Sequence, residues 1–340
     1  MKPRISVIIS AYNCELYVAE SIQSIIDQTC GNWEILIADD GSTDRTKSII
    51  DGFNDPRIRR FHNDKNLGLL NTWNNLAGQA KGEYLTWQDA DDISFPMRFQ
   101  KQLSALDADP DLMLCGCNHI RYYPYWGKTI VSNYPQSHLE IADVIKKQQI
   151  VPFTGATKML RRKILDKAPL FRPFFDGLGW EDYDFILRTL ENFKVGNIPD
   201  VLYEYRYTRG SSSRKINEEA FLKIYMNQVG FFLSDQRHRN NGLDGLMAGG
   251  DKQGLDNFLK ELKCEFEKDT SILYRKSSLN KISNMDYYYA LLDAIKAVTK
   301  EPLIVLNYLL FIRLFASLIN AGLKRIRTQF HIGGKIVKQL

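Results

Sequence analysis

The sequence predicts an α/β fold, with a mostly parallel β-sheet flanked by helices and a helical extension after it. Three observations support this prediction. Short β-branched runs alternate with segments of helical periodicity through the first third of the chain. Acidic clusters follow two of these runs directly. Beyond residue 213 the pattern turns helical and stays so to the end.

The elements alternate in the order expected for a parallel sheet. Strands are predicted at 5–10, 33–38, 58–62 and 84–88, and helices at 15–28, 43–53 and 69–80. Continuous apolar runs of this kind are typical of parallel strands that are buried on both faces. The pattern then predicts a helix at 99–106, a strand at 112–118, a hairpin or loop at 122–136, a helix opening at 180–182 and a strand at 201–207.

The pattern divides the chain into a catalytic domain at 1–213 and a helical extension at 214–340. The first domain divides further into a nucleotide-binding half, 1–115, and an acceptor half, 116–213. A hydrophobic content of 44% and a charged content of 25% indicate a globular protein and exclude a disordered or fibrous one. The net charge of +5 suits an anionic partner, but the basic residues form no patch before the tail, so no nucleic-acid partner is expected.

Targeting signals and cysteines favour a cytoplasmic protein. No signal peptide is recognised, and no apolar stretch of about 20 residues predicts a membrane span. The cysteines are odd in number and scattered, which favours reduced thiols: Cys14, Cys30, Cys115, Cys117 and Cys264.

The first acidic cluster follows the fourth predicted strand. Asp89, Asp91 and Asp92 lie within four residues, and their mutual repulsion needs a cation or hydrogen-bond donors to offset it. An Asp-x-Asp pair suits a hard divalent ion that shares oxygen ligands with phosphates. The alternative is a set of helix-capping acids before Ile93.

Two further clusters have the same double interpretation. After the second strand, Asp39 can accept a hydrogen bond from a uracil N–H or a ribose hydroxyl, or the segment can be a simple Asp-Gly turn. Glu181 and Asp182 can supply a general base for an acceptor hydroxyl, or can be acids at a helix N-terminus. Beside them, Trp180 can stack on a sugar or pack in the core.

These clusters, in this order, resemble glycosyltransferase family 2, a group with the GT-A fold, over about residues 4–213. The match begins with the segments at 6–13, 24–29 and 37–44. It continues through Asn66-Leu67-Gly68, Asn74, Gly82-Glu83-Tyr84, the acidic segment 89–92, Pro96, Arg98, Gln102, Glu181-Asp182, Tyr205-Arg206 and Gly210-Ser211.

The resemblance implies roles for individual positions. Ala11, Tyr12 and Asp39 match the group that binds the base, Asp89 the acid near ribose and phosphates, and Asp91 the metal ligand, with Asp89 beside it. Asp182, with Glu181, matches the catalytic base, and Arg206, Arg209 and Ser211 match a polar loop over the diphosphate. The other positions expected to line the donor site are Asn13, Asp40, Asn66, Gly68, Ala90 and Trp180.

Two departures from the family pattern are informative. Trp73 stands where the family often has an arginine, so one phosphate contact is missing. The Gln-x-x-Arg-Trp motif of processive members is also absent, which argues against a polymerising synthase.

The implied reaction is inverting transfer of a sugar from a nucleotide-sugar, typically a UDP-hexose or UDP-N-acetylhexosamine, assisted by Mn²⁺ or Mg²⁺. The implied acceptor is a saccharide or lipid-linked saccharide of bacterial surface polysaccharide synthesis. A nucleotidyltransferase is one alternative, but segment 11–15 has no glycine and no lysine for a phosphate loop. A non-catalytic nucleotide- or glycan-binding module is the other, and the intact Asp39, Asp91 and Asp182 count against it.

The last forty residues predict a basic amphipathic helix. Arg313, Ser317, Asn320, Lys324 and Arg327 recur at steps of four and three, opposite apolar residues. Such a helix can lie peripherally on the inner face of the cytoplasmic membrane. It can equally pack on the catalytic domain or on a second subunit of a homodimer.

Overall fold

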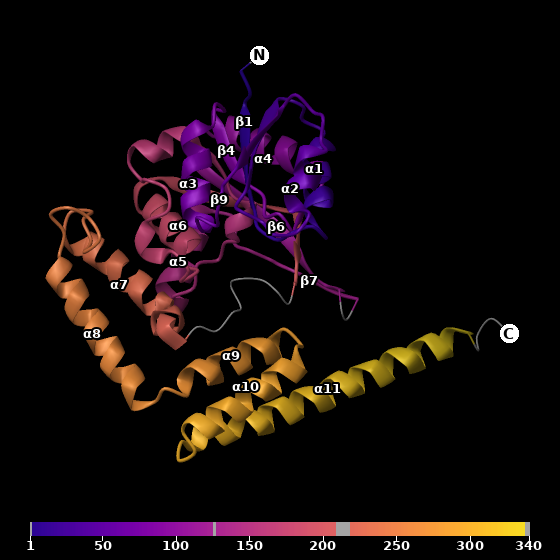
Figure 1. Ribbon diagram of the computed structural model, residues 1–340, viewed down its shortest axis with the longest axis vertical. Helices are drawn as coiled ribbons and strands as arrows, with labels where there is room; N and C mark the ends of the chain where they lie inside the picture. The colour runs from indigo at the N-terminus through magenta and orange to yellow at the C-terminus, as the bar shows by residue number, and fades with distance from the viewer. Residues whose placement is uncertain (1, 125–126, 209–217, 337–340) are drawn as a thin grey trace. The chain divides into compact units, whose positions relative to one another are not determined.

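A computed structural model describes residues 2–124, 127–208 and 218–336, without the side chains of 218–220 and 322–336. The chain divides into two compact units, Met1–Ser213 with Gly230–Gly250, and Arg214–Val229 with Asp251–Leu340. The predicted α/β fold with a helical C-terminal extension is confirmed (Figure 1). Residues 230–250, which were expected in the extension, group with the first unit.

One mixed sheet forms the centre of the first unit, in the order β3-β2-β1-β4-β8-β6-β9-β5, with β7 paired to β6. The parallel strands are β1 (Ile5–Ala11), β2 (Trp33–Asp39), β3 (Ile58–His62), β4 (Tyr84–Trp87), β6 (Leu112–Tyr123) and β9 (Lys194–Arg206). The antiparallel ones are β5 (Ile93–Ser94), β7 (Lys128–Val131) and β8 (Met159–Arg161). The carboxyl ends of β1, β2 and β4 therefore meet at one edge.

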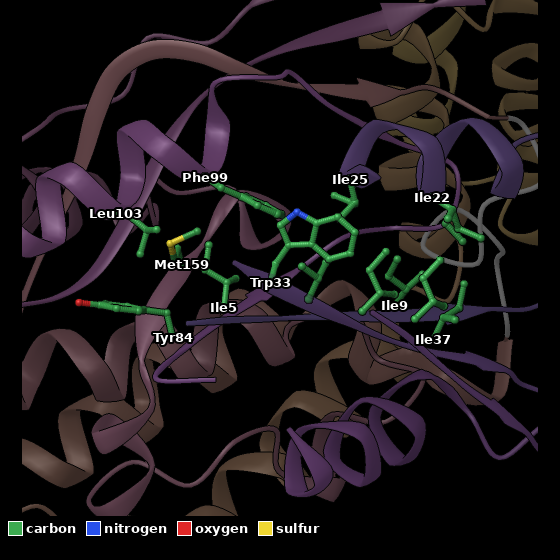
Figure 2. Packing of buried hydrophobic residues seen from close by; sticks show 14 of the residues in the cluster. Ile5, Ile9, Ile22, Ile25, Trp33, Ile37, Tyr84, Phe99, Leu103 and Met159 are labelled. Atoms are coloured by element: carbon green, nitrogen blue, oxygen red, sulfur yellow. The ribbon is translucent and has the colours of Figure 1, made fainter. Parts of the chain in front are cut away.

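Helices cover both faces of this sheet (Figure 1). One face packs against α1 (Val18–Ile26), α2 (Thr46–Asp51) and α4 (Arg98–Ala108). Figure 2 shows this layer, where alternate residues of β1 and β2 such as Ile9 and Ile37 meet Ile22 of α1. The other face carries α3 (Leu69–Gln79) and α6 (Glu181–Asn192), joined through Phe171, whose ring contacts Trp73, Trp87 and Phe185.

Several boundaries differ from the sequence prediction. The first helix begins at Val18 and not at residue 15, because the backbone N–H groups of Cys14 and Glu15 donate instead to Thr46, the first residue of α2, and to Asp44 just before it. β6 and β9 are longer than predicted, because they pair along most of their length. Helix α5 (His138–Gln148) was missed, although Ser137 and Glu140 form a capping box that the sequence displays. Short 3₁₀ turns lie at Gly155–Thr157, Arg162–Asp166 and Pro173–Phe175.

The helical extension contains α8 (Lys252–Lys268), α9 (Ile272–Ser283), α10 (Tyr287–Lys300) and α11 (Val305–Ile336), preceded by a 3₁₀ segment at Glu218–Ile224. Helix α7 (Met226–Arg239) crosses the boundary between the two units. Small buried residues of α10, such as Ala290 and Ala294, pack against Leu310 and Leu314 of α11. Within the described residues, no helix is long and apolar enough to cross a membrane.

Candidate active site

The ends of β1 and β2 lie side by side and form the first part of the site. Ala11 and Asp39 are paired in register, and the backbone N–H of Asp40 donates to the carbonyl of Ala11 at 2.8 Å. The Asp39 side chain is 2% exposed, and one of its oxygens accepts from the backbone N–H of Ser42 at 3.4 Å. Tyr12, by contrast, is 45% exposed, so its ring is available to a ligand above this edge.

Asn13 joins the loops after these two strands. It has a left-handed backbone, with φ of 51°, which asparagine tolerates better than most residues. Its backbone N–H donates to the Ser42 hydroxyl at 3.0 Å, and its side-chain oxygen accepts from the backbone N–H of Thr43 at 2.9 Å. These bonds fix the loops relative to each other and use much of the polar capacity of Asn13.

Asp40 holds a neighbouring loop in place. Its Oδ1 accepts from the side chains of Asn63 and Thr72 and from the backbone of Leu67, while its Oδ2 accepts from the backbone of Gly68. Asn66 is exposed, and its side-chain oxygen also accepts from the Gly68 N–H at 2.9 Å. Asp40 therefore shapes the loop that carries Asn66 and Gly68, whereas its neighbour Asp39 accepts from the backbone of Ser42, in the turn directly after β2.

The Asp-x-Asp segment follows β4. Ala90 is buried between Asp89 and Asp91, both of which are partly exposed. The Thr208 hydroxyl donates to Oδ2 of Asp91 at 3.2 Å, and the backbone N–H of Arg206 donates to Oδ1 of the buried Asp92 at 2.8 Å. The end of β9 therefore closes over this acidic segment.

Electrostatics connect Asp89 to the other acids. Burial, together with the negative charges of Asp91 and Asp182, raises the pKa of Asp89 to about 7. Burial and the charge of Asp182 likewise raise the pKa of Glu181 to about 7. Burial and the charges of Asp89 and Asp91 raise the pKa of Asp92 well above its usual range. The acids after β4 and those at the start of α6 thus form one electrostatic cluster.

Arg98 supports this cluster from beneath. The side chain is fully buried and donates to the hydroxyls of Thr86 and Ser94 and to the carbonyl of Ala156. It also donates to Gln88, whose own amide donates to the backbone carbonyls of Asp89 and Asp92. The sequence showed Arg98 as part of the family pattern but did not reveal this supporting role.

Lys158 lies against the Asp182 carboxylate, and sequence reasoning missed it. Its Nζ donates to Oδ1 of Asp182 at 2.5 Å and to the carbonyl of Gly155 at 2.8 Å. The lysine side chain is fully buried, while that of Asp182 is 24% exposed. No motif in the sequence marks this lysine, because its partner lies 24 positions away.

A cluster of aromatic and polar side chains surrounds Thr154, which directly precedes Gly155 in the chain. The Thr154 hydroxyl contacts Nδ1 of His119 at 3.2 Å and the hydroxyl of Tyr134 at 2.8 Å, and the ring of Tyr205 meets that of His119 edge-on. Burial and the charge of Arg121 lower the pKa of His119 to about 4, so the imidazole is neutral at pH 7. No local pattern predicts this cluster, because its members come from separate segments of the chain.

Two residues expected at the donor site have structural partners. Trp180 is only 6% exposed and packs on Phe175, Tyr183 and Phe231, which favours the core interpretation of this residue. The Arg206 guanidinium pairs with Glu20 at 2.8 Å and ties β9 to α1. Arg209 and Ser211 lie outside the described residues.

The acids do not form a complete metal cage by themselves. In the part of the chain that the structure describes, no group of three or more His, Cys, Asp or Glu side chains is arranged to hold a metal ion. The expected pair, Asp89 and Asp91, supplies two carboxylates at most, so any cation held there needs further oxygen ligands from a bound molecule.

Comparisons with known proteins agree on one family. The family Glycosyl transferase family 2 matches residues 6–168. The putative glycosyltransferase EpsE of Bacillus subtilis is 31% identical over 219 residues, which cover 63% of this chain and 76% of EpsE. The UDP-Glc:alpha-D-GlcNAc-diphosphoundecaprenol beta-1,3-glucosyltransferase WfgD of Escherichia coli is 33% identical over 242 residues, or 68% of this chain and 87% of WfgD.

Solved structures support the fold. Residues 1–349 of Staphylococcus aureus TarS, in complex with UDP-GlcNAc, match with a TM-score of 0.55 at 21% identity, over 68% of this chain and 67% of that one. The mannosyltransferase PcManGT of Pyrobaculum calidifontis, in complex with GDP-Man and Mn²⁺, matches with a TM-score of 0.51 at 16% identity, over 94% and 81% of the two chains. At these identities the likeness establishes the fold alone.

The raised pKa of Asp89 predicts a pH-dependent stability difference. Between about pH 4 and 7 the unfolded carboxyl ionises while the folded one stays protonated, so raising the pH lowers the free energy of unfolding. An Asp89→Asn variant has no carboxyl at this position and so lacks this pH-dependent decrease. We therefore expect the free energy of unfolding of the variant, relative to that of the parent, to be higher at pH 8 than at pH 5. Urea unfolding with a chelator present measures this difference.

Asp55→Asn is the matched control. The hydrogen bond from Arg57 holds the pKa of Asp55 below its usual range, so that group is ionised at both pH values. Its effect on stability is expected to be the same at pH 5 and pH 8. If the effect of Asp89→Asn on the free energy of unfolding is also the same at pH 5 and pH 8, the electrostatic description of the cluster is contradicted.

Proposed function

Because this chain belongs to glycosyltransferase family 2, we propose that it transfers a sugar from a UDP-sugar to a saccharide or lipid-linked saccharide acceptor, with inversion at the anomeric carbon. The observation that carries the proposal is the convergence of acids from separate segments. Asp39 ends β2 and Asp91 follows β4, the two strands on either side of β1 in one sheet. Asp182 lies in the first turn of α6, and its negative charge acts on Asp89.

The donor is proposed to bind above the ends of β1 and β2. Asp39 is an acceptor suited to the N–H of a uracil ring, and the exposed ring of Tyr12 beside it offers a surface for the base. The name of WfgD specifies UDP-Glc as a donor and a diphosphoundecaprenol-linked acceptor, which supports a UDP-hexose or UDP-N-acetylhexosamine here. We propose a role in bacterial surface polysaccharide synthesis as well, which the lipid-linked saccharide acceptor in that name supports.

Asp91 and Asp89 are proposed to hold a divalent ion together with the donor diphosphate. The raised pKa of Asp89 fits this role, because burial and neighbouring carboxylates leave negative charge that a cation would offset. When bound, Mn²⁺ or Mg²⁺ supplies charge neutralisation for the leaving diphosphate.

A screen of nucleotide-sugars for manganese-dependent hydrolysis tests donor and metal together. We expect a UDP-sugar to be hydrolysed with Mn²⁺ and not with a chelator. The Asp91→Asn variant should need about tenfold or more Mn²⁺ for its half-maximal rate, because one carboxylate ligand is lost. Asp143→Asn, on the exposed surface of α5, should behave as the parent. Equal hydrolysis with chelator and with Mn²⁺ would contradict the metal assignment.

Asp182 is proposed to take the proton from the acceptor hydroxyl as it attacks the sugar. It stands at the start of α6 with part of its carboxylate exposed, which a base needs in order to reach a substrate. Its neighbour Glu181 is buried, and one of its side-chain oxygens has no hydrogen-bond partner. The two acids therefore differ in accessibility, and Asp182 is the better placed.

Replacement of Asp182 by Asn tests this assignment. The amide keeps the size of the carboxylate but cannot accept a proton, so we expect kcat for transfer to fall by about 10²–10⁴-fold. Binding of UDP in the presence of Mn²⁺ should change little, as measured by calorimetry. Near-parental transfer by Asp182→Asn would show that another group is the base.

Helices α10 and α11 are proposed to dock on an anionic membrane surface. Large apolar side chains are exposed along both helices: Leu291, Leu292, Ile295, Val305, Leu306, Leu309, Ile312, Phe315, Leu318 and Ile319. Residues 301–340 contain six Lys or Arg and one acidic residue, a balance that suits anionic headgroups. Docking would bring the enzyme to a lipid-linked acceptor.

Vesicle co-sedimentation of the full chain tests docking. Ile312 and Phe315 are each 67% exposed, and burying such a side chain contributes about 2 kcal/mol, or about 30-fold in partitioning. We therefore expect Ile312→Glu and Phe315→Glu to reduce binding to anionic vesicles by at least this factor, and Leu139→Glu on α5 to leave it unchanged. If both variants bind vesicles as well as the parent does, docking is contradicted. The same holds if the substitutions convert a dimer to a monomer and leave vesicle binding unchanged.

A further inference from the structure

Lys158 is a buried cation for which the proposed reaction has no stated use. It lies directly before β8, on the face of the sheet that α3 and α6 cover. Its side chain has no solvent exposure, and its ammonium contacts the Asp182 carboxylate at 2.5 Å. A buried ammonium is unfavourable unless a counter-charge and hydrogen bonds offset its lost hydration. Burying this ammonium therefore carries a considerable desolvation cost, which its contacts must offset.

Three aromatic rings surround the ammonium. Its Nζ lies 4.5 Å from the ring centre of Trp87, 5.2 Å from that of Phe171 and 5.6 Å from that of Trp73. Rings at such distances attract a cation and restrict where it can move. They come from β4, from the loop before α6 and from α3, so three separate elements fix one charge.

Gly155 closes the opposite side of the carboxylate. A Cβ at this position would lie 2.0 Å from Oδ2 of Asp182, so only glycine leaves room for the carboxylate. The Gly155 carbonyl also accepts from Lys158 at 2.8 Å. One oxygen of Asp182 thus meets the ammonium while the other lies against the Gly155 backbone.

We propose that Lys158 is a positioning residue that, with Gly155 as the opposing wall, fixes the Asp182 carboxylate in one orientation for proton transfer. The inference rests on the proposed role of Asp182 as the base. When a carboxylate is already held in the reactive orientation, the entropic cost of orienting it does not add to the activation barrier. The aromatic rings prevent the ammonium from following the carboxylate into solvent.

Two variants disturb the carboxylate from its two sides. Lys158→Met keeps most of the side-chain volume and removes the charge, while Gly155→Ala keeps the charge and displaces Oδ2. We expect each to lower kcat by about 10–100-fold, since small displacements at a reacting centre have effects of this size. The KM for the donor and the affinity for UDP with Mn²⁺ should stay near the parental values. Lys163→Met, at an exposed lysine of the same segment, is the control.

The double variant Lys158→Met/Asp182→Asn separates this inference from the proposed function. If Lys158 acts through Asp182, its substitution should slow transfer no further once Asp182 is Asn. A parental kcat in folded Lys158→Met, or an equal fall in both backgrounds, would overturn the inference and leave Asp182 as the base. If Lys158→Met does not fold, parental kcat in Gly155→Ala overturns it. Loss of the base assignment itself would appear separately, as parental transfer by Asp182→Asn.

Discussion

Like charges at one edge of the sheet are the constraint around which this structure is organised. Asp89, Asp91 and Asp92 follow β4, and Glu181 and Asp182 open α6 on the other side of the same electrostatic cluster. Their mutual repulsion, added to partial burial, opposes folding. Clusters of this kind are typical of sites that bind a cation or a charged substrate. Without a ligand, hydrogen-bond donors and positive charges of the protein must offset their repulsion.

That compensation comes from hydrogen-bond donors that surround the acidic segment. Arg98 and Gln88 hold the backbone of the acidic segment from the interior, and the end of β9 closes over it through Arg206 and Thr208. The same division appears after β2, where Asp40 is committed to a loop. Adjacent acids in one motif thus differ in the donors that they accept from: Asp40 is committed to the loop at residues 63–72, and the proposed contact with the donor is left to Asp39.

Those features that depend on local pattern could be predicted from the sequence. The apolar runs placed β1, β2 and β4, and the acids that follow them were assigned to one edge because parallel strands end together. Lys158 could not be predicted, because a single lysine in an apolar stretch acquires meaning only when Trp73 and Asp182 fold against it. For Trp180 both interpretations were open, and the residues that decide between them, such as Phe231, lie about fifty positions away.

Two kinds of positive charge can balance these acids: the buried ammonium of Lys158 and the proposed exchangeable divalent ion. Lys158 is covalently part of the chain and screened from water, so it balances Asp182 at all times and in one geometry. Asp89 and Asp91 are partly exposed, and the charge that raises the pKa of Asp89 remains for an exchangeable cation to offset. A fixed cation suits the proposed base, which must be ready before the acceptor arrives. An exchangeable one suits the proposed diphosphate site, whose own charge appears and leaves with each donor molecule.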